Sequence, residues 1–448
     1  MASYTPKVVP NEVNCCRATS HCHLSLNLIT SSSRTTLSSF PYRILGICVR
    51  LWLFTATGVS PFFRSRIQNC SIVIGKRARR QRLHSTRSTG VMHSHLESAE
   101  FFFSSGETHF ACRQIKEALC CYERAVELGL DANRGALQRW TCYMLLGRFE
   151  EAWQETDRTE SLRRRLDPCQ DHLPVHFRRV WNGQSLENRC VLVRCYHGLG
   201  DTIQFSRYIP ELKKIARHVI VQCSANIASL ISCIEGPDQV VSLENPPAEL
   251  DFDVDIELME LPYAFRTRLA TLPCRIPYVD VPGELTDSVA ARLATLEISR
   301  GKPRVGVVWQ SGTWNPERSI SFEQISELTS VEGVNFFSLQ RGAEMEGLPF
   351  GARWGAFVHA EDKEANLLRT AAAILNLDLI ISVDTMAAHL AGALGKPVWT
   401  LLPFAADWRW MLDREDSPWY RSMRLYRQNR PGDWRPVIKR VARHLKGM

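Results

Sequence analysis

The sequence predicts an α/β protein with two Rossmann-like domains built on parallel sheets, preceded by a short all-α segment. Two observations carry this prediction: apolar runs of strand length alternate with helical patterns from residue 187 onward, whereas residues 96–166 show helical periodicity alone. Apolar residues make up 45% of the chain and charged residues 23%, as in ordinary soluble globular proteins. With 448 residues, the chain has room for two or three domains that each bury a core.

The first 95 residues differ in composition from the rest. They hold 13 Lys and Arg residues but one acidic residue, Glu12, so the formal net charge of +8 originates in this tail. It therefore gives no reason to expect nucleic-acid binding by the folded part. The most apolar run, Ile44–Phe63, is interrupted by Arg50 and is not a clean membrane span. Three interpretations stay open: an organelle-targeting segment, a signal anchor, or a disordered extension upstream of a translation start at Met92.

Residues 96–166 are predicted to form tetratricopeptide-like helical repeats. A shift of 34 residues aligns Ile115 with Phe149 and Ala118 with Ala152, and this is the period of that repeat. Any amphipathic helical hairpin with small contact residues produces a similar pattern. Two repeats are too few to be stable alone, so the segment is expected to pack on the following domain or to self-associate. It serves either as a structural cap or as a surface for a protein partner.

The first Rossmann-like domain is predicted over residues 187–290. An apolar strand at 189–194 runs into a turn containing Gly198 and Gly200, and a helical pattern follows from Ile203. The glycines permit a tight turn and a close approach of the backbone. Asp201 is either the cap of this helix or a carboxylate at the sheet edge where open α/β folds bind their ligands. Further strands are predicted at 218–222, 239–242 and 253–258.

The second Rossmann-like domain is predicted over residues 300–448. Its first strand ends in the polar loop 310–319, after which Ser321 is expected to cap a helix, with Gln324 at the capping-box position. Alternation of strands and helices of this length indicates a parallel, doubly wound sheet. The four strands are expected at 303–309, 335–339, 377–383 and 396–402.

The loop after the third of these strands carries the most chemical features. Asp384, Thr385 and the free amides of a helix N-terminus converge at a strand end, which makes an anion site. His389 lies one turn into the helix, on the side of Thr385, and either binds a phosphate or is a hydrogen-bonded core histidine. Arg318 and Glu344 are expected on neighbouring strand-end loops, where they add a cation and a carboxylate to the same edge.

The 15 cysteines are scattered, without a CxxC pair or a set with the spacing of zinc ligands. Cys120 and Cys121 fall in a helical pattern, and Cys190 and Cys195 border a strand. Buried free thiols are therefore expected at these positions, in a reducing compartment, and no metal site is predicted.

Several strings of the C-terminal half resemble glycosyltransferase family 9. These are GLGDTIQFSRY at 198–208, SLQRGAE at 338–344, SVDTMAAHLAGALGKP at 382–397, LPFAADWRW at 402–410 and DSPWY at 416–420. The resemblance is to the superfamily of ADP-heptose:lipopolysaccharide heptosyltransferases, and most of all to its bacterial members with tetratricopeptide repeats. It covers a little over half of the chain.

The resemblance implies a GT-B fold, in which two Rossmann-like domains flank the active site, and inverting sugar transfer without an obligatory metal or other cofactor. Asp201 matches the base that takes the proton of the acceptor hydroxyl. Arg318 replaces a lysine near the donor phosphates, and Glu344 matches a carboxylate that contacts the nucleoside. Met386 stands where heptosyltransferases often have Gly or Ala, which leaves the donor sugar open. The segment expected to bind the donor diphosphate and sugar comprises Asp384, Thr385, Met386, Ala387 and His389.

The leading hypothesis is thus an inverting glycosyltransferase that uses a nucleotide-diphosphate sugar. Its acceptor is a glycan, a lipid-linked saccharide or a protein, and its expected location is the cytoplasm. The alternatives are a non-catalytic helical-repeat adaptor on a degenerate transferase scaffold, and an α/β epimerase, which needs no separate acceptor. Binding of nucleotide sugars separates the first alternative from the leading hypothesis, and dependence on an acceptor separates the second.

Overall fold

In the computed structural model, the described residues are 98–166, 181, 183–247, 249–294, 301–312, 315–340, 354–355 and 366–448. All of them belong to the second of two compact units, which begins at residue 44. The expectations for the basic tail, and for Glu344, therefore fall outside the described residues. No helix in the described ranges combines the length and the apolar character that a membrane crossing requires.

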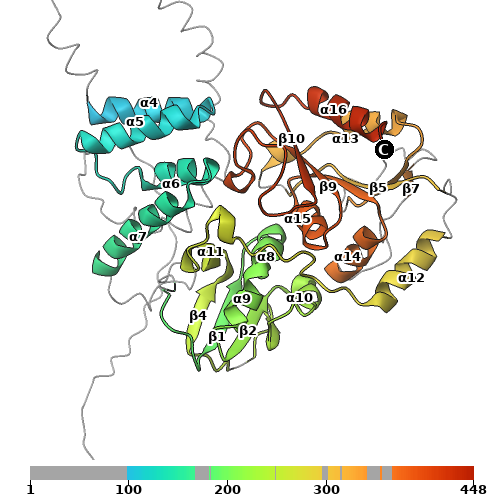
Figure 1. Cartoon of the computed structure of the whole chain (residues 1–448), viewed down its shortest axis with the longest axis horizontal. Coiled ribbons are helices and arrows are strands. Elements are labelled where there is room, and N and C mark those ends of the chain that lie inside the picture. Colours follow the sequence, from blue (N-terminus) through green and yellow to red (C-terminus); the bar gives the residue numbers. More distant parts are fainter. Residues whose placement is uncertain are drawn as a thin grey trace, which may run out of the picture. The chain divides into compact units, whose positions relative to one another are not determined.

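Four helices form the all-α segment, as its periodicity predicts. Gly106 of the first helix packs on Tyr122 of the second, where an added Cβ would lie 2.6 Å from the tyrosine ring. The predicted contact positions Ala118 and Ala152 are fully buried, which lets the helices approach closely. The tetratricopeptide assignment itself stays a prediction. The helices are α4 (Ala99–Ala111), α5 (Ile115–Glu127), α6 (Ala136–Leu145) and α7 (Phe149–Leu166) (Figure 1).

The first α/β domain contains a four-stranded parallel sheet with the order β3-β2-β1-β4. Its central strand β1 is buried along almost its whole length, as parallel sheets covered on both faces require. The strands coincide with the predicted runs to within a residue or two, which confirms the Rossmann-like class of this half. The elements are β1 (Cys190–Cys195), α8 (Leu199–Phe205), α9 (Ile209–Lys213), β2 (His218–Cys223), α10 (Ala225–Ile231), β3 (Gln239–Ser242), β4 (Val254–Glu257) and α11 (Leu261–Ala264).

The second α/β domain contains a six-stranded parallel sheet with the order β10-β9-β8-β5-β6-β7. Three elements lie outside those predicted from the sequence: β7, β10 and α16. Helix α12 (Gly283–Ala294), at the crossing between the domains, packs against α14 of this half. The other elements are β5 (Arg304–Val308), α13 (Phe322–Ile325), β6 (Asn335–Ser338), β7 (Trp354–Gly355), α14 (Leu367–Leu375), β8 (Leu379–Val383), α15 (Met386–Ala393), β9 (Val398–Leu402), β10 (Met423–Arg427) and α16 (Arg435–Leu445).

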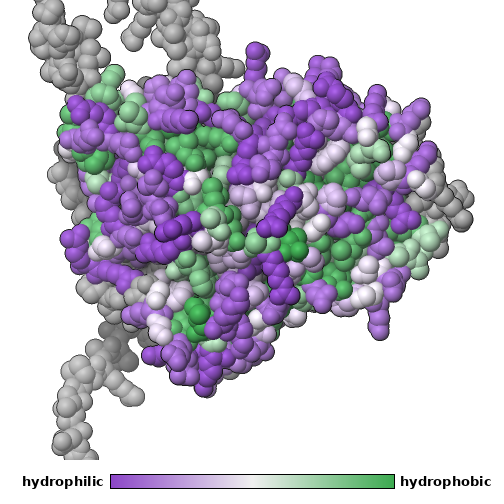
Figure 2. Space-filling model, viewed as in Figure 1, coloured by the Kyte–Doolittle hydropathy of each residue, from purple (hydrophilic) through white to green (hydrophobic). Residues whose placement is uncertain are grey.

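Within these elements, the predicted helix cap is confirmed, and the predicted burial of cysteines is confirmed only in part. Ser321 caps α13 as predicted, because its side chain accepts a hydrogen bond from the Gln324 amide. The prediction of buried thiols is wrong for Cys120, which is exposed because α5 turns its opposite face toward the neighbouring helices. Cys190 and Cys195 are buried as the first and last residues of β1. On the face seen in Figure 2, hydrophilic side chains predominate, and hydrophobic ones gather in smaller areas between them.

The two α/β domains contact each other through α8 and α15. Each helix follows the carboxyl end of a central strand, β1 in the first sheet and β8 in the second. In parallel sheets of this kind, ligands bind at the carboxyl ends of the strands. The topology therefore brings the two loops singled out in the sequence to one place.

Candidate active site

Asp201 lies in the first turn of α8, directly after β1. Gly198 occupies the N-cap position, with φ −60° and ψ 155°, and the helix begins at Leu199. The interpretation of Asp201 as the cap is therefore wrong. Its Oδ1 instead lies 2.9 Å from Nη2 of Arg409, a residue of the second domain. The residue is 5% exposed, so this ion pair is buried at the edge of the first sheet.

Gly200 allows α8 to approach α15. A Cβ at this position would lie 2.9 Å from Cδ2 of His389 and 3.6 Å from Cα of Met386. A Cβ at Gly198 would lie 3.0 Å from Oδ2 of Asp201. Neither glycine has a positive φ. The predicted close approach is thus real, but it is made between two helices of different domains rather than toward a ligand.

Asp384 directly follows β8 and is also buried, with 2% exposure. Its Oδ2 lies 4.0 Å from Nη1 of Arg318, and its Oδ1 lies 3.9 Å from Nε2 of His389. Burial raises the pKa of Asp384, although Arg318 and Arg409 act in the opposite direction. A buried carboxylate between a guanidinium and an imidazole is placed to orient both of them.

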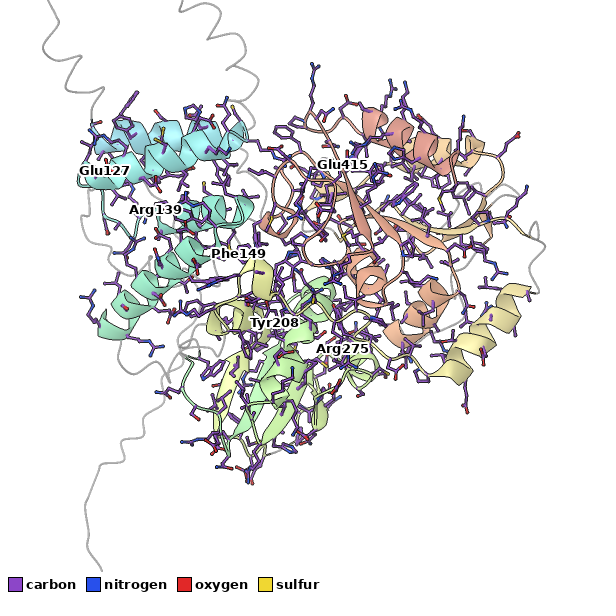
Figure 3. The ribbon with its side chains drawn as sticks, in the orientation of Figure 1. Glu127, Arg139, Phe149, Tyr208, Arg275 and Glu415 are labelled. Atoms are coloured by element: carbon purple, nitrogen blue, oxygen red, sulfur yellow. The ribbon has the colours of Figure 1, made fainter. Side chains whose placement is uncertain are left out.

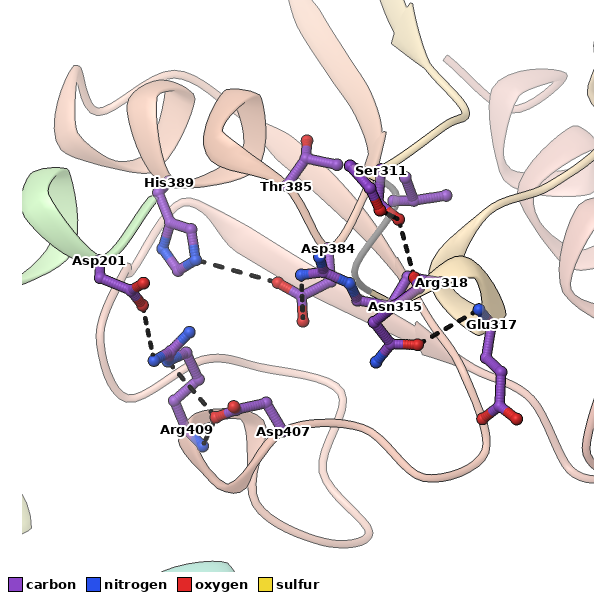
Figure 4. A network of polar contacts seen from close by, with 12 residues as sticks. Asp201, Ser311, Asn315, Glu317, Arg318, Asp384, Thr385, His389, Asp407 and Arg409 are labelled. Atoms are coloured by element: carbon purple, nitrogen blue, oxygen red, sulfur yellow. Dashed lines mark hydrogen bonds and ion pairs between the residues drawn. The ribbon is translucent and has the colours of Figure 1, made fainter. Parts of the chain in front are cut away.

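Thr385 takes the N-cap position of α15, in extended conformation. The hydroxyl groups of Thr385 and of Ser382, near the end of β8, form a hydrogen bond with 3.0 Å between their oxygens. In Figure 4, Thr385 lies toward Ser311, whereas His389 lies toward Asp201, with Asp384 between them. The expectation that Thr385 and His389 meet one ligand stays a prediction. Met386 and Ala387 follow as the first two residues of α15.

His389 is buried and held from several sides. Its Nδ1 is 3.0 Å from the hydroxyl of Tyr420, and its ring stacks on Trp410 with centroids 5.3 Å apart. Burial lowers the pKa of His389 well below its ordinary value, and the nearby arginines, first among them Arg409, lower it further. The imidazole is therefore neutral at neutral pH. If Tyr420 donates to Nδ1, the Nε2 proton points toward Asp384.

Arg409 connects the two halves of this cluster. It belongs to a short 3-10 turn, Trp408–Trp410, in the segment between β9 and β10. Besides Asp201, its guanidinium meets Asp407, with Nε 3.4 Å from Oδ1. Burial opposes the charge of Arg409, but the surrounding carboxylates raise its pKa, so it stays cationic. Figure 4 shows the continuous line of contacts from Asp201 through Arg409 to Asp407.

The environment of Asp201 raises its pKa to about 6. Burial is the largest cause, the cation of Arg409 opposes it, and the negative charges of Asp407 and Asp384 add to it. The carboxylate is therefore mostly ionised at pH 7 yet basic enough to accept a proton. A general base acts best when its pKa lies near the working pH, and Asp201 meets that condition.

Arg318 is the second cation of the site and ends the short 3-10 turn Pro316–Arg318, after β5. Its side chain is 12% exposed, which is more than the 3% of Asp384 beside it. A guanidinium that keeps some exposure on the loop after a strand is of the kind that binds anionic groups in proteins. Of the residues predicted for donor binding, Arg318, Asp384 and His389 thus lie together.

Sequence reasoning assigned no role to Arg409, Trp410 or Tyr420. All three stand in strings that carry the family resemblance, at 402–410 and 416–420. The available signal was a charged residue between two tryptophans, a pattern that points to burial and hence to a buried partner. The partner itself, Asp201, comes from the other domain and has no signature near Arg409 in the sequence.

Comparison with known proteins gives a distant set of neighbours. No profile of a known protein family matches the chain. Protein FlbA of Caulobacter vibrioides is 24% identical over 375 residues, which are 74% of this chain and 59% of FlbA. The chain therefore spans less than two thirds of that relative's length.

Among solved structures, a glycosyltransferase family 9 protein of Veillonella parvula has a TM-score of 0.41 at 11% identity, over 55% of this chain and 88% of that one. The ADP-heptose lipopolysaccharide heptosyltransferase II of E. coli has a TM-score of 0.39 at 13% identity, over 58% and 98%. The dodecameric glycosyltransferase TibC of enterotoxigenic E. coli has a TM-score of 0.32 at 17% identity, over 49% and 60%.

Proposed function

We propose that this chain is an inverting glycosyltransferase, which moves a sugar from a nucleotide-diphosphate sugar to an acceptor hydroxyl. One observation carries the proposal: a carboxylate of the first domain, Asp201, and the anion-binding elements of the second meet in a single buried cluster. In that cluster Asp201, with a pKa of about 6, pairs with the guanidinium of Arg409. A second guanidinium, Arg318, lies beside Asp384, the residue that precedes the N-cap of α15.

Asp201 is the proposed base. The acceptor oxygen attacks the anomeric carbon as its proton passes to the carboxylate of Asp201. The bond from the anomeric carbon to the phosphate oxygen breaks, and its electron pair leaves with the nucleoside diphosphate. Attack opposite to the leaving group inverts the configuration at the anomeric carbon. Base catalysis of this kind contributes roughly 10²- to 10⁴-fold to the rate.

The leaving diphosphate is proposed to bind at the loop 384–389. The first amides of α15, at Met386 and Ala387, lack partners within the helix and point to where an anion would sit. Thr385, Arg318 and His389 are proposed to complete the site. Asp384 lies beside the proposed phosphate site, but its carboxylate would repel a phosphate, so it is not itself a proposed ligand. Its proposed task is to hold Arg318 and His389 in position.

The proposal includes no obligatory metal, as the family resemblance implies. The negative charge that grows on the diphosphate is met by fixed cations and amides, which stabilise it in the transition state. The nucleoside is proposed to contact Glu344, which lies outside the described residues. The nucleotide, the sugar and the acceptor class — glycan, lipid-linked saccharide or protein — are left to experiment.

The test begins with binding, measured on the full chain by calorimetry with ADP-, UDP- and GDP-sugars. The proposal expects one of them to bind, and release of the nucleoside diphosphate only when an acceptor is present. The anomeric configuration of the product, read by NMR, should be inverted, and EDTA should leave the rate unchanged. Absence of binding to every donor would favour the adaptor alternative, and turnover without acceptor would favour the epimerase.

A further inference from the structure

The helical segment contacts the loop that carries Arg409. We call residues Phe404–Met411 the Arg409 loop. The ring of Trp140, on α6, meets the ring of Trp408 edge to face, with centroids 5.6 Å apart. Arg113, in the turn between α4 and α5, donates a hydrogen bond to the backbone carbonyl oxygen of Phe404. The guanidinium of Arg113 also lies 5.5 Å from the centre of the phenyl ring of Phe404. The loop is thus held at its start and near its end by the same segment.

A third contact reaches the backbone of Arg409 itself. Phe149, the first residue of α7, stacks on Trp419 with centroids 6.4 Å apart. The indole Nε1 of Trp419 donates to the carbonyl oxygen of Arg409 over 2.8 Å. Figure 3 shows Phe149 on the side of α7 that faces the α/β domains. One aromatic residue, Trp419, thus contacts both the helical segment and the backbone of Arg409.

The same helical segment is also fixed to the first domain. The indole Nε1 of Trp153 donates to the carbonyl oxygen of Thr267 over 2.8 Å. Asp157 accepts hydrogen bonds from the hydroxyl of Tyr263 and from the guanidinium of Arg266. The helical segment therefore contacts both the domain that supplies Asp201 and the Arg409 loop.

We infer that the helical segment positions the catalytic site: it holds the Arg409 loop so that Arg409 reaches Asp201, with Trp140 and Arg113 as positioning residues. The inference rests on the proposed function for its catalytic meaning. The charged groups that face Asp201 are Arg409 and Asp407 of the loop and Asp384 at the end of β8. Movement of the loop changes two of these three at once.

The test compares Trp140→Ala with Tyr143→Ala, a matched variant one turn further along α6. Tyr143 is buried within the helical segment, where its hydroxyl donates to Glu123 and Arg148 lies over its ring. Both variants remove one aromatic ring from the same helix. Of these two rings, that of Trp140 meets the Arg409 loop edge to face, so its loss should affect the loop and the loss of Tyr143 should not.

Two readouts are measured on the full chain. Hydrogen exchange of peptides covering residues 404–411 should become about tenfold faster in Trp140→Ala and stay as in the wild type in Tyr143→Ala. The reason is that the free energy contributed by one aromatic pair corresponds to about a tenfold change in the local opening equilibrium. The acid limb of kcat/KM should move to a pH about one unit higher in Trp140→Ala. Movement of the loop weakens the effects of both Arg409 and Asp407, and the cation of Arg409 lowers the pKa of Asp201 more than the charge of Asp407 raises it. The value of kcat/KM at pH 7 should fall about 10- to 100-fold.

Unchanged exchange in the loop together with a wild-type pH profile in Trp140→Ala would overturn the inference. If Trp140→Ala exchanges faster in the loop but the wild-type chain transfers no sugar, the proposed function is contradicted and the support of the loop by the helical segment stands. If Trp140→Ala does not fold, Arg113→Gln gives the same comparison from the other end of the loop, and Trp140→Phe should restore most of the protection. A loop that exchanges equally fast in Tyr143→Ala would show a general loosening of the helical segment, and would also overturn the inference.

Discussion

The two strand-end loops look alike in sequence but are built differently. Each follows a buried parallel strand, carries an aspartate and leads into a helix. The loop 384–389 is held largely by its own domain, through Ser382, Arg318 and Tyr420. Asp201, in contrast, is paired with a residue of the other domain. The contacts of the loop 384–389 therefore come mainly from its own domain, whereas the ionisation of Asp201 depends on how the two domains meet.

The largest effect should come from Asp201→Asn. If Asp201 is the base, kcat should fall roughly 10²- to 10⁴-fold while the donor Kd stays unchanged, because the anion site belongs to the other domain. Single-turnover kinetics and calorimetry measure the two quantities. Asp255→Asn is the matched control, since Asp255 pairs with Arg194 in the same sheet, away from the cluster. Full activity of Asp201→Asn would remove the base assignment.

The converse effect is expected for Arg318→Gln. Loss of a charged hydrogen bond to the diphosphate should raise the Kd for the donor about 10- to 100-fold, with a smaller change in the rate of the proton-transfer step. Arg421→Gln removes an exposed arginine of the same domain and should leave the Kd as it is. Equal donor affinity in both variants would mean that the diphosphate binds elsewhere.

Gly200→Ala tests the contact between the domains. The new Cβ would lie 2.9 Å from His389, so α8 and α15 must separate, at a cost of about 1–3 kcal/mol in the free energy of unfolding. Gly283→Ala, at the start of α12 where nothing lies within 4 Å, should be neutral or slightly stabilising. Denaturant unfolding compares the two. Equal stability of both variants would show that the helices are less closely packed than the structure indicates.

The smallest effect concerns pH. Because the pKa of Asp201 is raised to about 6, its carboxylate becomes protonated below that pH, and kcat/KM should fall about tenfold per pH unit there. The sign for stability is opposite. The folded state disfavours ionised Asp201, so its penalty is present above pH 6 and is relieved as the pH falls toward 4. Residual activity of Asp201→Asn should lack this acid limb; its persistence would assign the limb to another group.

The sequence predicted the strands that are continuous apolar runs and missed those that are not. β10 lies at the edge of its sheet and alternates buried Met423 and Leu425 with the more exposed Arg424. Such a strand gives no apolar run. α16 buries an apolar stripe with helical spacing, from which this helix could have been predicted. The stripe consists of Val437, Ile438, Val441 and Leu445.

By itself, the sequence determined the order of strands and helices, the two loops at strand ends and the residue types within them, because each follows from local hydrophobic periodicity and turn chemistry. Only the tertiary structure decided what the loops do for each other. The pairing of Asp201 with Arg409, the neutral state of His389 and the support of the Arg409 loop by the helical segment all join parts that are distant in the chain. Burial and neighbouring charge set the pKa of Asp201, and both arise only when the two domains and the helices pack together.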